Sequence, residues 1–118
     1  MRVRLEERAG FVIVRPEGPR LDLCTTAAFK HTVSVAASES PRAVILDFGA
    51  VAEIDSAGLG ALVAALKCIR RFGGSMTVCG LQPAVREILD LTRVSRILSI
   101  RGTLDEALAQ ESVPARCH

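Results

Sequence analysis

The sequence of 118 residues has neither tryptophan nor tyrosine, and four phenylalanines are its only aromatic residues. Proteins that bind single-stranded nucleic acid stack bases on several aromatic rings, so this class is excluded. Excess charge of one sign is also missing, because fifteen basic residues against thirteen acidic ones leave a net charge of +2. Contacts to duplex phosphates need a larger basic excess, and we therefore expect no direct nucleic-acid partner.

Long apolar runs are absent as well. The longest run, Ala61 to Leu66, is far shorter than the roughly 18 residues that span a bilayer. The segment Met1 to Glu7 carries charges without an apolar stretch behind them, which argues against a signal peptide. We therefore expect a cytoplasmic protein without a membrane partner. Apolar residues form 49% of the chain and charged residues 24%, a composition that predicts a single domain over residues 1–118.

The four cysteines form no recognisable metal or redox motif. Cys24, Cys68, Cys79 and Cys117 include no Cys-x-x-Cys pair, and no histidine follows them at zinc-ligand spacing. In a cytoplasmic chain they are expected to be reduced thiols, and only Cys117 is expected to be clearly exposed. The sequence thus predicts neither a metal site nor a cofactor.

Strand-like and helix-like patterns alternate along the chain. The runs Val3 to Leu5 and Phe11 to Val14 predict a hairpin of strands. Further strands are expected at 43–48, 75–79 and 97–100, and helices at about 25–38 and 103–110. Two more helices are expected between them, one that begins near Ser56 and stops at Gly73-Gly74, and one that begins at Pro83 and includes Leu89. The fold class is therefore α/β, with a mixed, mostly parallel sheet of about four to five strands, an N-terminal hairpin and about four helices.

The most informative segment is the turn before the helix that is expected to begin near Ser56 and to stop at Gly73-Gly74. Ser56 is expected at or beside the N-cap of this helix, with its hydroxyl accepting hydrogen bonds from free backbone N–H groups. Gly58 and Gly60 follow in the first turns, each at a cost of about 1 kcal/mol relative to alanine. Close approach of another molecule to the bare helix backbone would explain these glycines.

Two interpretations of this turn are open on the residues alone. The pair Asp55-Ser56 can be a helix cap and nothing more. Alternatively, Ser56 can be a phosphorylation site, because free N–H groups and the positive end of the helix dipole favour a dianion there. A phosphate would add about −1.5 to −2 charges beside the carboxylate of Asp55 and so act as a switch.

The chain also resembles the STAS domain family, the domains of sulfate transporters and anti-sigma factor antagonists. The likeness runs from Val44 to Ile100 and is greatest to the stand-alone bacterial anti-sigma factor antagonists. The motifs that carry it are Ile45-Leu46-Asp47, Ile54-Asp55-Ser56-Ala57-Gly58-Leu59, Phe72-Gly73-Gly74 and Pro83-Ala84-Val85, with Leu21-Asp22 near the N-terminus.

The resemblance implies that Ser56 is the phosphoacceptor and that Asp22 and Asp55 are its acidic neighbours. It also implies a protein that is monomeric when free and is not an enzyme. Its partners would be an anti-sigma factor that is also a serine kinase, and a serine phosphatase. The sequence departs from the family pattern in two places. Ala57 replaces a second serine of many relatives, and Arg93 stands where relatives tend to have glycine, so the third helix is expected to end differently.

The helix expected after Asp55 has two contrasting sides. At 100° per residue its large apolar side chains face the sheet. The opposite side is expected to be an exposed partner-binding surface, formed by Ala57, Gly58, Gly60, Ala61, Ala64, Lys67, Cys68 and Arg71. The alternative is that a neighbouring helix of the same domain covers this strip, since small residues also permit close helix packing.

Two other functions are alternatives to a phosphorylation switch, namely catalysis and a structural role in a transporter complex. Catalysis by Ser56 would need a base, and the only histidines are His31, within the first expected helix, and His118, the last residue. Asp47 is expected to end a strand as a solvated residue rather than to hold a metal. The remaining alternative is a constitutive STAS subunit of a transporter complex, such as a lipid-transport ATPase, without a phosphorylation cycle.

Overall fold

A mixed sheet organises the chain, seen in a computed structural model that describes residues 2–39 and 43–110. Five strands of the described residues pair in the order β1-β2-β4-β6-β7. The strands are β1 (Val3–Arg8), β2 (Phe11–Pro16), β4 (Ala43–Asp47), β6 (Ser75–Cys79) and β7 (Ser99–Arg101). Only β1 runs antiparallel to its neighbour. The predicted α/β class and N-terminal hairpin are therefore confirmed.

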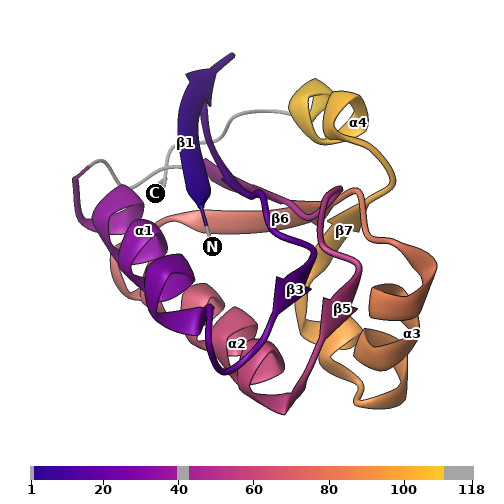
Figure 1. The fold of residues 1–118 in the computed structure, drawn as a ribbon. Helices are drawn as coiled ribbons and strands as arrows, with labels where there is room; N and C mark the ends of the chain where they lie inside the picture. Colours follow the sequence, from indigo (N-terminus) through magenta and orange to yellow (C-terminus); the bar gives the residue numbers. More distant parts are fainter. Residues whose placement is uncertain (1, 40–42, 111–118) are drawn as a thin grey trace.

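Four α-helices accompany the sheet in the described part of the chain (Figure 1). They are α1 (Thr26–Glu39), α2 (Ser56–Arg71), α3 (Pro83–Leu91) and α4 (Leu104–Ala109). Helices α1 and α2 lie side by side, whereas α4 lies at the far side of the sheet. No described helix is both long and apolar enough to cross a membrane.

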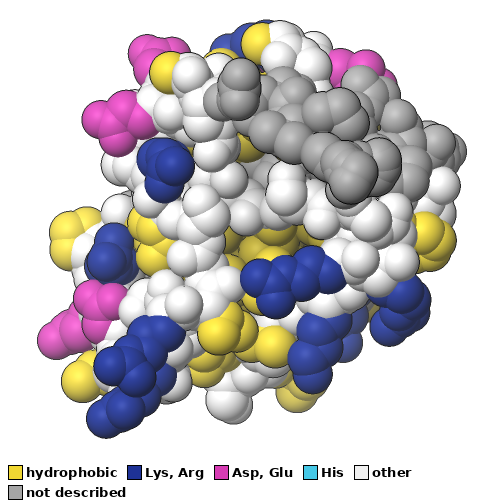
Figure 2. Space-filling view, turned by 180° about the vertical axis from the view of Figure 1, so that it is seen from behind, with side chains coloured by type: hydrophobic (Ala, Val, Ile, Leu, Met, Phe, Trp, Pro, Cys, Tyr) yellow, Lys and Arg dark blue, Asp and Glu magenta, His cyan; other side chains and the backbone are white. Residues whose placement is uncertain are grey.

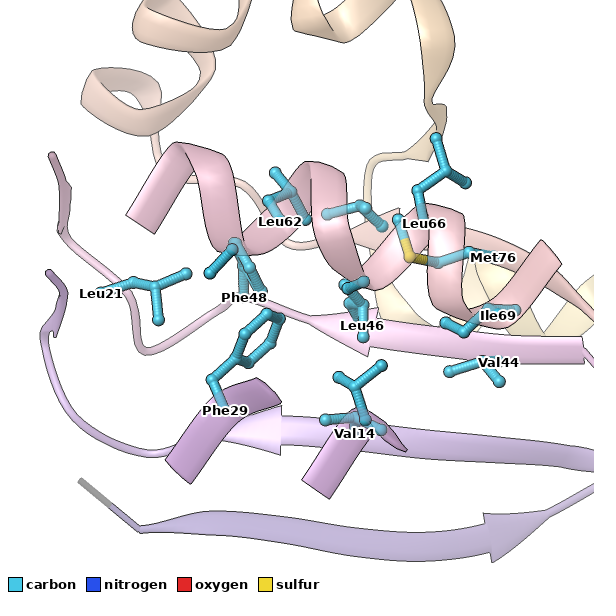
Figure 3. Close-up of a cluster of buried hydrophobic side chains, with 14 of the residues drawn as sticks. Val14, Leu21, Phe29, Val44, Leu46, Phe48, Leu62, Leu66, Ile69 and Met76 are labelled. Atoms are coloured by element: carbon cyan, nitrogen blue, oxygen red, sulfur yellow. The ribbon is translucent and has the colours of Figure 1, made fainter. Parts of the chain in front are cut away.

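Alternating side chains fill a core on each face of the sheet. In β2, Val12 and Val14 point to the core beneath α1 and α2, while Phe11 and Ile13 join a smaller cluster that includes Ala107 of α4. This alternation follows from the two-residue period of a strand with both faces covered. Figure 3 shows the larger core, with Phe29 of α1 and Phe48 after β4 facing one another. Their ring centroids lie 6.1 Å apart, edge to face.

A second, two-stranded sheet was not predicted from the sequence. It pairs β3 (Arg20–Leu21) with β5 (Glu53–Ile54) in parallel. The Pro19 carbonyl extends the pairing, because it accepts hydrogen bonds from the amides of Ala52 at 2.7 Å and Glu53 at 2.9 Å. Each strand leads directly to the start of a helix, β3 toward α1 and β5 into α2. The small sheet thereby brings the two helix starts together.

The segment after α3 differs from the expectation. Residues 97–100 were predicted as a strand, but a 3₁₀ helix, Val94–Ile97, comes first and β7 begins only at Ser99. Arg93 has a φ of 65°, a left-handed conformation that glycine adopts at no cost. Arg93 thus keeps the backbone shape that a glycine would favour. Cys117, expected to be exposed, lies outside the described residues.

Candidate functional site

Asp55, rather than Ser56, caps α2. The Asp55 backbone is extended, and its Oδ1 accepts a hydrogen bond from the amide of Gly58 at 2.8 Å. The expectation that the serine hydroxyl would take this amide is therefore wrong, because Ser56 is already the first helical residue. Its side chain is exposed and forms no hydrogen bond with any other described residue. The hydroxyl is consequently accessible at the positive end of the helix dipole.

Gly58 is required by the chain itself. A Cβ on this residue would lie 2.0 Å from the carbonyl oxygen of Leu21 and 2.8 Å from Cγ1 of Ile54. The expectation that the bare backbone serves another molecule is wrong at this position, since β3 already occupies the space. Gly60 differs, because a Cβ there would meet nothing within 4 Å. Of the two glycines, only Gly60 lies on open surface.

Asp22 organises the turn that leads into α1. Its Oδ1 accepts hydrogen bonds from the amide of Cys24 at 3.0 Å and from the Thr25 hydroxyl at 3.3 Å. The Asp22 amide in turn donates to Oγ1 of Thr25 at 2.9 Å. The turn reaches the start of α2 through Leu23, whose amide donates to Oδ2 of Asp55 at 3.4 Å. Asp55 therefore connects both helix starts, with one carboxylate oxygen for each.

An acidic pocket of about 420 Å³ opens beside this junction. Its lining combines β3, β5 and α3, and consists of Arg20, Asp22, Ala52, Glu53, Ile54, Asp55, Ala84 and Ile88. Arg20 is paired with Glu53 at 3.0 Å. No ion pair joins Asp22 or Asp55 to another residue in the described parts of the chain, so two carboxylates leave the pocket negatively charged.

The small-residue side of α2 is only partly exposed. Ala61 is 1% exposed and Gly58 is buried, so the expectation of exposure is wrong for both. Helix α1 packs against α2, and Ala61 belongs to the same core as Phe29 and Val33 of α1, which agrees with the alternative interpretation. The remaining residues of the expected surface divide into partly buried Ala57 and Cys68, and exposed Gly60, Ala64, Lys67 and Arg71.

A shallow groove runs between α1 and α2 where they separate. Its volume is about 200 Å³, and Ala64, Ala65 and Cys68 of α2 line it together with Lys30, Val33 and Ser34 of α1. On α2 the lining residues lie between the N-cap Asp55 and the basic last turn, which contains Arg70 and Arg71. Figure 2 shows Lys and Arg side chains over the lower half of the rear face, with acidic side chains only near its margins.

Asp47 and two of the cysteines lie in environments that differ from one another. Asp47, expected to be solvated, instead accepts a hydrogen bond from Nε of Arg15 at 3.0 Å, with the pair about three-quarters buried or more. Burial, reinforced by the charge of Asp47, raises the pKa of the Cys79 thiol to about 12. Cys24 is exposed. The expectation that Cys117 would be the only clearly exposed cysteine is therefore wrong. Neither thiol contributes to the junction of the helix starts through its sulfur.

Three comparisons place this geometry among known proteins. The anti-sigma F factor antagonist of Paenibacillus polymyxa is 28% identical over 96% of this chain and 97% of that protein. The crystal structure of an anti-sigma factor antagonist from Mycobacterium paratuberculosis is 27% identical, with a TM-score of 0.81 over 91% of this chain and 90% of that one. The murine anion transporter Solute Carrier 26 family member A9 shares the fold alone, at 19% identity and a TM-score of 0.75, and the match covers 87% of this chain but 18% of the transporter.

The family model of the STAS domain matches residues 2–107, which includes the sheet, both helix starts and the acidic pocket. The chain therefore belongs to the STAS domain family.

Proposed function

We propose that the protein is an anti-sigma factor antagonist whose binding to its partner is switched off by phosphorylation of Ser56. This proposal rests on the different roles of Asp55 and Ser56 at the start of α2. Asp55 supplies the cap, and the exposed Ser56 hydroxyl has no structural task among the described residues. A phosphate can therefore be added without removing the hydrogen bond that begins the helix. The names of the relatives described above support the same role.

The partner is an anti-sigma factor that is also a serine kinase. When it binds the unphosphorylated protein, it releases its sigma factor. The Ser56 oxygen then attacks the γ-phosphorus of the ATP held by the kinase, the bond to the β-phosphate oxygen breaks, and ADP leaves. The hydroxyl proton passes to a base of the kinase or to water. A serine phosphatase later hydrolyses the phosphoserine, and the cycle can start again.

The charge around Ser56 explains why the phosphorylated form would be released. A phosphoserine carries about −1.5 to −2 charges at neutral pH. It would stand next to the Asp55 carboxylate and near the acidic pocket, where Asp22 has no ion-pair partner among the described residues. Before phosphorylation, the partner surface is complementary to these acidic side chains. After phosphorylation, the same partner surface would face a much more negative surface of this protein, and the complex would be weaker. The domain itself keeps its cap and its core.

The binding surface in this proposal is the exposed part of the strip on α2. Gly60 and Ala64 let a partner approach the helix backbone, Lys67 and Arg71 lie at the rim, and Ala57 and Cys68 contribute their accessible atoms. Gly58 and Ala61 take part only through the fold, because they are buried. The protein acts in the cytoplasm, as a monomer when free, and performs no catalysis itself.

A constitutive subunit of a transporter complex is the competing function, and the fold of the murine anion transporter shows that transporters also contain this domain. The two functions differ in what happens to Ser56. The test is to incubate the protein with its cognate anti-sigma factor and ATP, and to map the phosphate by mass spectrometry. We expect labelling of the wild type on Ser56 and none of Ser56→Ala. Equal labelling of Ser56→Ala would refute the acceptor, and binding without any labelling would favour a constitutive partner.

A further inference from the structure

Leu23 is unusually prominent for a large apolar residue. Its side chain is 77% exposed, the highest value among the exposed large hydrophobic residues of the described chain. A single exposed leucine needs no explanation by itself. This leucine differs in its position, at the tip of the turn between β3 and α1 and against the start of α2.

The backbone that carries Leu23 is held by hydrogen bonds on both sides. The Asp22 carbonyl accepts hydrogen bonds from the amides of Thr25 at 3.0 Å and Thr26 at 3.1 Å. The Asp22 carboxylate accepts a further one from Cys24. A side chain presented by such a turn has little backbone freedom left to lose on binding, and this lowers the entropic cost of association.

A further hydrogen bond places Leu23 beside the residue that precedes the proposed phosphoacceptor. The Leu23 amide donates to Oδ2 of Asp55 at 3.4 Å, and Ser56 is the next residue in the chain. A kinase that reaches the Ser56 hydroxyl must therefore cover the turn that displays Leu23. The acidic residues Asp22 and Asp55 flank the leucine, so the complementary surface is apolar at its centre and basic at its edge.

We propose that Leu23 is an apolar anchor that inserts into a hydrophobic pocket with a basic rim on the anti-sigma factor. This inference rests on the proposed function, and it adds the residue that orients the partner over Ser56. An apolar side chain surrounded by polar contacts is a typical centre of an interface, where burial excludes water from the neighbouring charges. Leu23 thereby contributes affinity, while Ser56 contributes the switch.

The test is a binding titration of the unphosphorylated protein with its anti-sigma factor. Leu23→Ser should raise Kd by about tenfold or more, whereas Leu23→Met should bind nearly as the wild type does. Leu91→Ser is the matched control, because Leu91 is 76% exposed but lies on the outer face of α3. It should leave Kd unchanged, and all three variants should melt at the wild-type temperature, since their side chains are exposed.

The possible failures are distinguishable. Wild-type affinity in Leu23→Ser would overturn the anchor and leave the antagonist function intact. An equal loss in Leu91→Ser would show a general effect of surface hydrophobicity and would also overturn it. A lowered melting temperature in Leu23→Ser, with affinity and melting temperature both restored in Leu23→Met, would make Leu23 structural. A stable Leu23→Met that does not bind would overturn the anchor. A wild type that binds no anti-sigma factor would refute the proposed function together with the anchor.

Discussion

The carbonyl oxygen of Leu21 lies so close to Gly58 that a single methyl group on the glycine would stand 2.0 Å from it. The same carbonyl accepts a hydrogen bond from the Asp55 amide at 3.3 Å. Strand β3 thus packs against the first turn of α2, and the turn that follows β3 lies beside Ser56. The region around the proposed phosphoacceptor therefore consists of two segments more than thirty residues apart in the sequence.

Gly58→Ala is expected to disturb this junction. The backbone of β3 cannot yield as a flexible side chain would, so the variant should lose about 1–3 kcal/mol of unfolding free energy, as overpacked sites do. Gly60→Ala is the control, because its Cβ enters open space. It should gain up to about 1 kcal/mol from helix propensity. Urea unfolding of both variants measures the difference, and equal stability of the two would contradict the close approach.

Asp22 is expected to act through its charge as well as its hydrogen bonds. Asn can accept the same hydrogen bonds from Cys24 and Thr25, so Asp22→Asn should keep the melting temperature while slowing phosphorylation of Ser56. Asp22→Ala should also lose about 1 kcal/mol, because it removes acceptors from the turn. Phosphorylation rates and thermal melts of both variants separate the two effects. A large drop in melting temperature for Asp22→Asn, with phosphorylation intact, would make Asp22 a purely structural residue.

Much of the fold could be predicted from the sequence because its signals are local. The period of the apolar residues placed α2, and β6 was expected at the residues where it occurs. Pro83 correctly predicted the start of α3. The Asp55-Ser56 pair before an apolar helix pattern indicated the turn at Ser56, and the structure shows that this serine is exposed at a helix start.

The remaining features depend on contacts between distant segments. The pairing of β3 with β5 involves two residues on each side and leaves no periodic pattern. The role of Gly58 depends on the position of Leu21, and the burial of Ala61 depends on the core that α2 forms with distant segments. The pairing of Asp47 with Arg15 likewise needs the parallel register of β2 and β4. Asp55 could have been identified as the cap from sequence, since aspartate is as good an N-cap as serine.

The proposal that the partner binds at the groove between α1 and α2 can be tested by introducing a charged side chain there. Ala64 is exposed on its rim, so Ala64→Glu should change stability by no more than about 0.5 kcal/mol. It should weaken binding to the anti-sigma factor by about 1 kcal/mol or more. Ala61→Glu, one turn earlier and buried, should unfold the protein because it buries an unpaired charge. A pull-down and a thermal melt are sufficient. Full binding by a stable Ala64→Glu would place the partner elsewhere.

The cysteines should differ in reactivity. Exposed Cys24 should react with iodoacetamide in the native protein at pH 8, whereas buried Cys79 should react only after unfolding, because its raised pKa leaves it protonated. Peptide mapping of the labelled protein tests this order. Rapid labelling of Cys79 in the native state would contradict its burial.

The same raised pKa makes stability depend on pH. The native thiol ionises near pH 12 and the unfolded thiol near its ordinary value of 9.0. Its contribution is therefore complete below pH 9.0 and is lost as the pH rises toward 12, because the unfolded state releases the proton first. The unfolding free energy of the wild type should fall relative to that of Cys79→Ala across this range. Parallel curves for the two proteins would show that the thiol ionises equally in both states.

The most direct test of the account is the affinity of one anti-sigma factor for the two forms of this protein. Isothermal titration should give a Kd for the protein phosphorylated on Ser56 that is at least about tenfold higher than for the unphosphorylated protein. Treatment with the serine phosphatase should restore the original Kd. The same Kd for both forms, with phosphate verified on Ser56 by mass spectrometry, would contradict the switch.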